Sequence, residues 1–74
     1  MKLTRADRKQ IKQEGLTHAK VIRIRRDSHG YPNLLIEARD NSGFKFRGWW
    51  RDGESIRDIR WETENANGWP KNVQ

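Results

Sequence analysis

The sequence predicts an α+β protein, mostly β, in which one short N-terminal helix precedes a four-stranded antiparallel meander. Three observations support this class: a helix capping signature near the N-terminus, an apolar period of two from Thr17 onward, and turn residues that interrupt this pattern. We expect the sheet to curl into a small SH3-like barrel, because a thin polar helix cannot cover its apolar face alone. An open meander with the helix across one face is the alternative. All 74 residues, 1–74, are expected to form a single domain.

The predicted helix spans residues 5–14. Thr4 suits the N-cap, Asp7 stands at N3 where it completes a capping box, and Gly15 suits the position after the helix end. Few apolar residues lie within this segment, so we expect it to pack weakly against the sheet. The cations of the helix are candidate phosphate contacts: Arg5, Arg8, Lys9 and Lys12.

The strands follow from the alternation of apolar and polar residues. They are separated by a polar loop at 27–32, by Asn41-Ser42-Gly43 and by Asp52-Gly53, a signal for a two-residue turn. These turns define a register that pairs Ala38 with Phe46, and Phe46 in turn with Ile59. The predicted strands are residues 18–26, 33–39, 44–51 and 55–63, followed by a polar tail at 65–74.

One face of the predicted sheet is apolar and should form the core. The chain has no cysteine, so its stability must come from this packing or from a partner, not from disulfides. Gly48, in the middle of the third strand, is expected to mark a bend or a bulge. The expected core residues are Ile22, Ile24, Leu34, Ile36, Ala38, Phe44, Phe46, Trp50, Ile59 and Trp61.

The opposite face is expected to carry three rows of side chains across the strands. Alternating charges in the first row would stabilise the sheet. The apolar second row needs a cover, either the helix or a partner. Like charges in the third row repel, and phosphate would neutralise them. The rows are Arg23, Glu37, Arg47 and Asp58; then Arg25, Leu35, Trp49 and Ile56; and then Val21, Arg39, Lys45 and Arg60.

The formal net charge is +6, and the basic excess lies within residues 1–26. Such a field attracts polyanions, nucleic acid before others. We therefore predict a small basic nucleic-acid-binding module, for DNA or RNA, with mostly phosphate-backbone contacts. Trp49 would stack on a base or wedge between bases. The predicted contact residues are Arg5, Arg8, Lys9, Lys12, Arg23, Arg25, Arg26, Arg39, Lys45, Trp49 and Arg60.

Two other functions fit the same residues. A protein-interaction module would dock through Leu35, Trp49 and Ile56, as an adaptor or as an inhibitor of a larger complex, of the kind that phages and mobile elements encode. A homodimer that buries the same row is a third interpretation. Sedimentation would distinguish a homodimer from the other two.

The motifs of an enzyme or a metal protein are not found in the sequence. There is no cysteine nucleophile, no glycine-rich phosphate motif, and no metal-ligand spacing between His18 and His29. We therefore expect no enzyme activity, no metal and no cofactor. No apolar run reaches membrane-spanning length and no signal peptide follows Met1, so we expect a cytoplasmic protein without a membrane partner.

Overall fold

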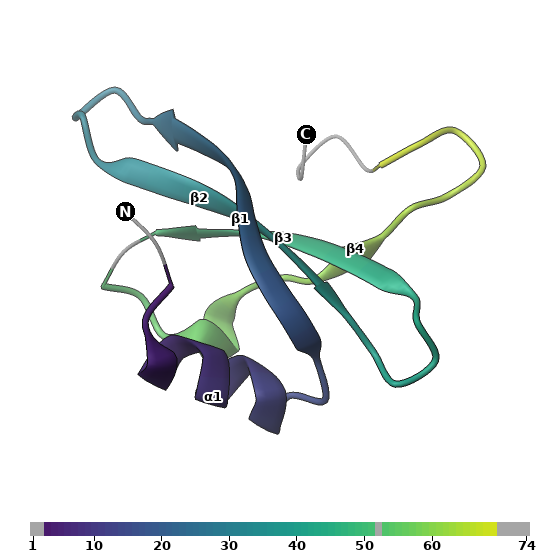
Figure 1. The fold of residues 1–74 in the computed structure, drawn as a ribbon. Helices are drawn as coiled ribbons and strands as arrows, with labels where there is room; N and C mark the ends of the chain where they lie inside the picture. The colour runs from purple at the N-terminus through teal and green to yellow at the C-terminus, as the bar shows by residue number, and fades with distance from the viewer. Residues whose placement is uncertain (1–2, 52, 70–74) are drawn as a thin grey trace.

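The structure is a computed structural model, and it describes residues 3–51 and 53–69. It confirms the α+β class, with one short helix and an antiparallel sheet in the order β1-β2-β3-β4 (Figure 1). Helix α1 and the 3-10 helix η1 lie on the same side of the sheet, and they contact each other. In chain order the elements are α1 (Arg5–Gln13), β1 (Thr17–Arg26), β2 (Pro32–Arg39), β3 (Lys45–Arg51), η1 (Ile56–Asp58) and β4 (Glu62–Thr63).

The sheet is open, and the predicted closure into a barrel is not found among the described residues. β1 and β4 form its two edges and do not pair with each other. β4 has two residues only, so it offers little backbone to a further strand. The covering that a barrel would supply comes instead from α1 and η1. The alternative architecture, an open meander with the helix across one face, describes the structure.

The N-terminal helix forms as its capping signature predicts. The Thr4 hydroxyl accepts a hydrogen bond from the Asp7 amide at 3.1 Å, and the Asp7 carboxylate accepts one from the Thr4 amide at 3.0 Å. Gly15 follows the helix with φ at +85°, a left-handed conformation that glycine adopts without strain. Ile11 is fully buried, so even this polar helix is anchored in the core.

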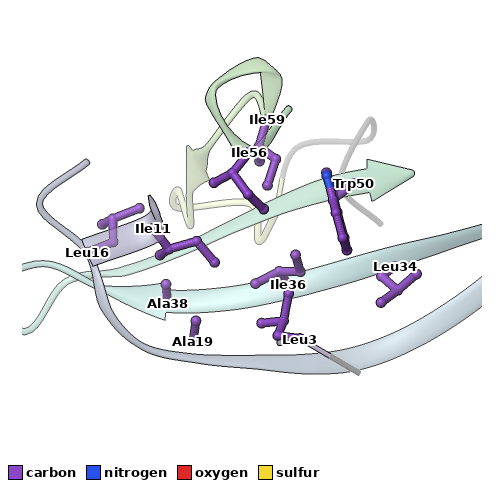
Figure 2. Close-up of a cluster of buried hydrophobic side chains, with 10 residues drawn as sticks. All are labelled: Leu3, Ile11, Leu16, Ala19, Leu34, Ile36, Ala38, Trp50, Ile56 and Ile59. Carbon is purple, nitrogen blue, oxygen red and sulfur yellow. The ribbon is translucent and has the colours of Figure 1, made fainter. Parts of the chain in front are cut away.

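The core lies between the sheet and the two helices (Figure 2). Five of the predicted core residues are buried, and Phe46 and Trp61 pack at its margin. Three further contributions come from helix α1 and its flanks, at Leu3, Ile11 and Leu16, and two come from Ala19 of β1 and Ile56 of η1. The buried apolar cluster consists of Leu3, Ile11, Leu16, Ala19, Leu34, Ile36, Ala38, Trp50, Ile56 and Ile59.

Three predicted core residues are exposed, and that part of the prediction is wrong. Ile22 is 37% exposed, Ile24 is 49% exposed and Phe44 is 67% exposed. The two isoleucines lie on edge strand β1, and Ile22 falls where the β1–β2 register shifts. Phe44 lies in the turn before β3, beyond the part of the sheet that α1 and η1 cover.

The bulges lie on β1 and not at Gly48. The β1–β2 register shifts between Thr17 and Lys20 and again between Val21 and Arg23. The β2–β3 register is regular and agrees with the prediction. Gly48 has another role, since a Cβ there would lie 2.4 Å from the Ile59 side chain. Its missing side chain lets the segment before β4 pack closely against β3.

The prediction of a strand over residues 55–63 is wrong, apart from its last two residues. The Ser55 hydroxyl accepts from the Arg57 amide and caps η1, and Ile56 and Ile59 both enter the core. A spacing of three residues brings two side chains to one side of a helical turn, whereas in a strand it would place them on opposite faces. β4 pairs later than expected, with Arg47 opposite Glu62. Asp52 and residues 70–74 lie outside the described residues.

The first two hairpins share one turn design, Asp-x-x-Gly-aromatic. Each aspartate Oδ1 accepts from the amides two and four residues later, at 2.8–3.0 Å, as at Asp27 and Asp40. The glycine amide donates to the aspartate carbonyl, with φ at +84° for Gly30 and +87° for Gly43. Gly43 thus lies in the left-handed region, as expected for the glycine of a three-residue Asn-Ser-Gly loop.

Candidate nucleic-acid interface

The sheet face turned away from α1 is called the outer face here. Residues of β2 alternate, so Leu34, Ile36 and Ala38 face the core while Leu35 and Glu37 face the other side. Strand register extends this face across the sheet. Its rows are Thr17, Arg39 and Lys45; Lys20, Glu37, Arg47 and Glu62; Arg23, Leu35 and Trp49; and Arg25, Asn33 and Arg51.

These rows differ from the predicted rows in the residues that β1 and the predicted fourth strand contribute. The bulges of β1 add residues without partners, so Lys20 and not Arg23 lies opposite Glu37. Arg23 instead joins the row of Leu35 and Trp49. The members taken from β2 and β3 are as predicted, because that register is regular. Asp58, Ile56 and Arg60 leave the rows, since none of them belongs to a strand.

Glu37 is the buried charge of the outer face. Arg47 donates to its carboxylate at 3.0 Å and Lys20 lies 3.7 Å away, while the Glu37 side chain is only 8% exposed. Burial raises the pKa of Glu37, but the hydrogen bond and charge of Arg47, with the charges of Lys20 and Lys45, bring it below its ordinary value. The predicted pair of Arg47 with Glu37 is confirmed.

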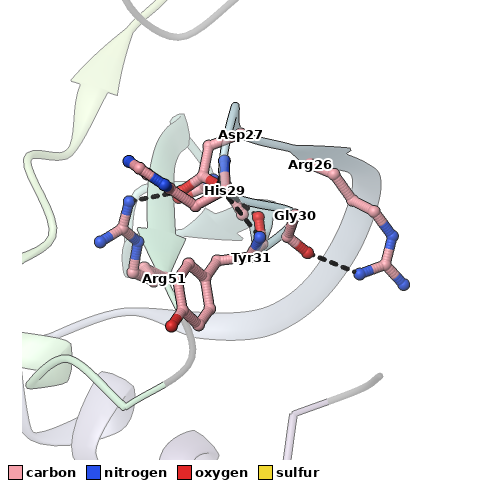
Figure 3. Close-up of polar contacts among 7 residues, drawn as sticks. Arg26, Asp27, His29, Gly30, Tyr31 and Arg51 are labelled. Atoms are coloured by element: carbon pink, nitrogen blue, oxygen red, sulfur yellow. Dashed lines mark hydrogen bonds and ion pairs between the residues drawn. The ribbon is translucent and has the colours of Figure 1, made fainter.

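A second ordered carboxylate stands at the rim of this face, in the β1–β2 turn (Figure 3). Asp27 accepts from the amides of His29 and Tyr31 and from the Arg51 guanidinium at 2.6 Å. Burial raises its pKa, but these hydrogen bonds and the Arg51 charge outweigh burial and lower it below the ordinary value. The sequence would also allow Arg51 to pair with Glu54 across the Asp52-Gly53 turn, but its ion pair in the structure is with Asp27.

Among residues 3–51 and 53–69, arginine and aromatic side chains form three pairs on the outer face. The Arg25 guanidinium lies 5.5 Å from the ring centre of Trp49, that of Arg47 lies 4.3 Å from Trp69, and that of Arg51 lies 5.7 Å from Tyr31. All three distances are within the range of a cation–π interaction. This face therefore combines positive charge with flat aromatic surface.

Arg39 and Lys45 lie directly opposite each other in the β2–β3 register. Both are exposed, and among the described residues no carboxylate lies within ion-pairing distance of either. Like charges opposite each other destabilise a sheet. An incoming anion at this point would relieve the repulsion.

The predicted contact residues divide between two sides of the molecule. Arg23, Arg25, Arg39, Lys45 and Trp49 lie together on the outer face. The helix cations Arg5, Arg8, Lys9 and Lys12 are carried on the core side of the sheet, and Arg60 lies between η1 and β4.

Two arginines also have local structural contacts. Arg8 donates to the carbonyl of Ala19 on β1, which holds the helix to the strand. Arg26 donates to the Gly30 carbonyl at 2.9 Å, within the β1–β2 turn (Figure 3). Both guanidiniums therefore stabilise the fold, and their contact with a ligand would compete with these hydrogen bonds.

The predicted apolar docking row is not present. Ile56 is 1% exposed and lies in the core, on the opposite side of the sheet from Leu35 and Trp49. Leu35 is itself only 3% exposed. Of the three residues, only Trp49 is partly accessible. A protein partner could not use them together as an anchor.

Sequence reasoning missed several members of the outer face: Lys20, Tyr31, Arg51 and Trp69. Tyr31 could have been recognised from the repeated Asp-x-x-Gly-aromatic turn, which orders its backbone. The position of Trp69 had no signal in strand alternation, because it follows the last strand.

Comparisons with family models, with curated proteins and with solved structures found no match to this chain. Within residues 3–51 and 53–69, no helix is long and apolar enough to cross a membrane. The same residues contain no cluster of histidine, aspartate and glutamate that could hold a metal ion.

Proposed function

We propose that this chain is a small basic nucleic-acid-binding module whose contact surface is the outer face of the sheet. The observation that carries the proposal is the charge on this face. Its cations outnumber the carboxylates Glu37 and Glu62 and, at the rim, Asp27, and both Glu37 and Asp27 are already paired. The cations in the register rows are Lys20, Arg23, Arg25, Arg39, Lys45, Arg47 and Arg51.

Phosphate contacts supply most of the affinity in this proposal. Exposed Arg39 and Lys45 bind adjacent phosphates, and the repulsion between them is relieved when the polyanion binds. Arg25 and Trp49 add a flat surface farther along the same face, beyond the row of Glu37 and Arg47. Arg47 and Arg51 contribute to the field while their ion pairs keep them in place.

The helix cations do not belong to this contact surface. α1 lies on the other side of the sheet, so a nucleic acid on the outer face does not reach Arg5, Lys9 and Lys12 and forms no phosphate contact with them. This separation gives a matched control. The double substitutions Arg39→Gln with Lys45→Gln and Lys9→Gln with Lys12→Gln remove the same charge from opposite sides.

The test is binding of fluorescent DNA and RNA, measured by anisotropy across a series of salt concentrations. We expect binding at about 50 mM salt that weakens steeply as salt rises. The outer-face double variant should reduce the slope of log K against log salt by roughly 1.5, since each lost phosphate contact removes about 0.7–0.9. The helix double variant should leave the slope nearly unchanged.

Two results would overturn the proposal. One is the absence of binding to any DNA or RNA at low salt. The other is an equal loss of slope in both double variants, because that outcome would mean unspecific attraction to the whole molecule. Circular dichroism of each variant checks that the fold is kept.

A further inference from the structure

We infer that the ligand of the outer face is a single-stranded polynucleotide, which follows β3 with its bases on the three arginine–aromatic pairs. The inference rests on the proposed function and names its substrate class. The ligand chemistry is an extended chain of phosphates with unpaired bases, from DNA or from RNA.

The first step is the arrangement of the pairs along β3. Arg47, Trp49 and Arg51 are alternate residues of this strand, and each takes part in one pair. Trp69 stands against the first, Arg25 against the second and Tyr31 against the third. Aromatic surface is thus repeated along one line, from the β4 side of the molecule to the β1–β2 turn.

The second step is the spacing of this line. Alternate residues of a strand lie about 6.8 Å apart. Stacked nucleotides in a duplex rise only about 3.4 Å per step. Successive bases of a duplex therefore cannot occupy successive pairs, whereas an extended, unstacked strand can. Aromatic side chains beside a cationic track are the usual way in which proteins hold such strands.

The third step is the space beside Trp49. A shallow cavity of about 230 Å³ is lined by Trp49, Asn33, Asp27, Arg25 and Arg26. It is smaller than the ~300–1,000 Å³ of typical small-molecule sites, and it suits a single flat base. Arg25 is exposed, so its guanidinium can move from the Trp49 ring to a phosphate when the base arrives.

The shape of the outer face also disfavours a duplex. α1 packs on the opposite side of the sheet, so it cannot enter a groove of a duplex bound here. Among the described residues, the elements that border this face are strands and turns. The major groove of a duplex admits an α-helix or a two-stranded β-ribbon, whereas the outer face belongs to a sheet of four strands.

Tyr31→Ala is the sharpest test, because the chain contains a matched control. Phe44 occupies the same position as Tyr31 in the second Asp-x-x-Gly-aromatic turn, and both are exposed, at 67% and 59% respectively. Tyr31 contacts Arg51 on the outer face, whereas the alternation of β3 turns Phe44 toward the core side. Both substitutions remove an exposed ring of similar size.

Binding is measured for short deoxythymidine and uridine oligonucleotides, a duplex of equal charge, and inorganic polyphosphate, which has charge but no bases. We expect single strands to bind more tightly than the duplex. Tyr31→Ala should weaken single-strand binding by roughly 5-fold or more, and Trp49→Ala by roughly 5- to 150-fold, the range for one stacked base. Phe44→Ala, Tyr31→Phe and Trp49→Phe should retain it, and polyphosphate binding should be insensitive to Tyr31→Ala.

The outcomes separate this inference from the proposed function. Absence of binding to every polynucleotide contradicts both. Duplex binding as tight as single-strand binding, or equal effects of Tyr31→Ala and Phe44→Ala, overturns the single-strand inference and leaves the cationic interface intact. A difference between the thymidine and uridine oligonucleotides, which differ in the sugar and in the C5 methyl group of the base, shows which of these two single strands binds more tightly, and either preference supports the inference.

Discussion

The two faces of the sheet are built from the same strands, yet different forces hold their side chains in place. On the core face, Leu34, Ile36 and Ala38 are fully buried against the helices. On the outer face, Leu35 and Glu37 of the same strand are nearly as buried, but three of their four cross-strand neighbours are charged. Burial alone therefore does not distinguish the two sides of β2.

The difference lies in what covers each side. The core face is covered by separate elements, α1 and η1, that contribute apolar side chains. The outer face is covered by its own long side chains and by Trp69, through ion pairs and cation–π contacts. Those side chains can exchange their partners for a ligand, whereas packed core residues cannot. Function is therefore expected on the outer face.

Adjacent tryptophans give the largest contrast between the faces. Trp50 is 4% exposed in the core, and its indole N–H donates to the Glu54 carbonyl at 2.9 Å. Trp50→Ala should reduce the free energy of unfolding by about 3–5 kcal/mol, the usual cost of removing a large buried aromatic side chain. Trp49 is half-buried on the outer face, so Trp49→Ala should cost less than half of that.

Urea denaturation of the two variants measures this contrast. In a domain of this size, Trp50→Ala is expected to leave little folded protein. Trp50→Phe keeps most of the buried volume and serves as the milder variant. Equal losses in the Trp49→Ala and Trp50→Ala variants would show that the outer face is as tightly packed as the core.

A smaller effect is expected at Gly48, where the core face has no room for a side chain. A Cβ at this position would lie 2.4 Å from the Ile59 Cγ2 and 3.1 Å from the Arg60 carbonyl oxygen. Gly48→Ala should therefore destabilise the protein by about 1–3 kcal/mol, as overpacking does. Thermal unfolding of Gly48→Ala in the wild-type and Ile59→Ala backgrounds tests the cause. Gly48→Ala should destabilise the protein less in the Ile59→Ala background than in the wild type. An equal loss of stability in both backgrounds would show that the contact with Ile59 is not the cause.

Gly48 also shows how far the sequence could predict this fold. The alternation of apolar residues correctly placed β2 and β3 and their register, because a regular strand has a fixed period of two. The capping residues correctly placed α1. The glycine was noticed, but a bulge and a close approach of another segment have the same sequence signal. Only tertiary contacts distinguish them.

The errors have physical reasons of the same kind. Alternation of apolar and polar residues does not reveal a bulge. The register shifts after Thr17 and after Val21 therefore gave the β1 residues other cross-strand partners than the predicted rows assigned to them. In η1, Ser55 and Asp58 fit a helix capping signature. The same segment also fits a strand in which Ile56 lies on the outer face and Ile59 on the core face. The helix cations were grouped with the strand cations because sequence does not show which side of the sheet a helix covers.

Glu37 provides the smallest expected effect, and it concerns how the outer face is held together. The pKa of Glu37 in the folded protein is below the ordinary value. At a given acidic pH, the folded protein therefore binds fewer protons at Glu37 than the unfolded chain does. The stability it contributes is fully present above its ordinary pKa of about 4 and is lost as the pH falls through the folded pKa. Glu37→Gln removes the charge and keeps the shape of the side chain. It should cost about 1 kcal/mol at neutral pH, the typical worth of one hydrogen bond.

The measurement is the thermal midpoint of both proteins between neutral and strongly acidic pH. The gap between wild type and Glu37→Gln should narrow as the pH falls below about 4, because the Glu37 carboxyl then binds a proton in the unfolded chain first and in the folded protein only at lower pH. The pKa of Asp27 is lowered too, so adding Asp27→Asn to Glu37→Gln should make the thermal midpoint fall less as the pH is lowered. Gly48→Ala is the control from the core face, and its cost should not change with pH. If the Glu37→Gln gap is constant over the whole range, packing and not charge holds this carboxylate, and the two faces differ less than their composition indicates.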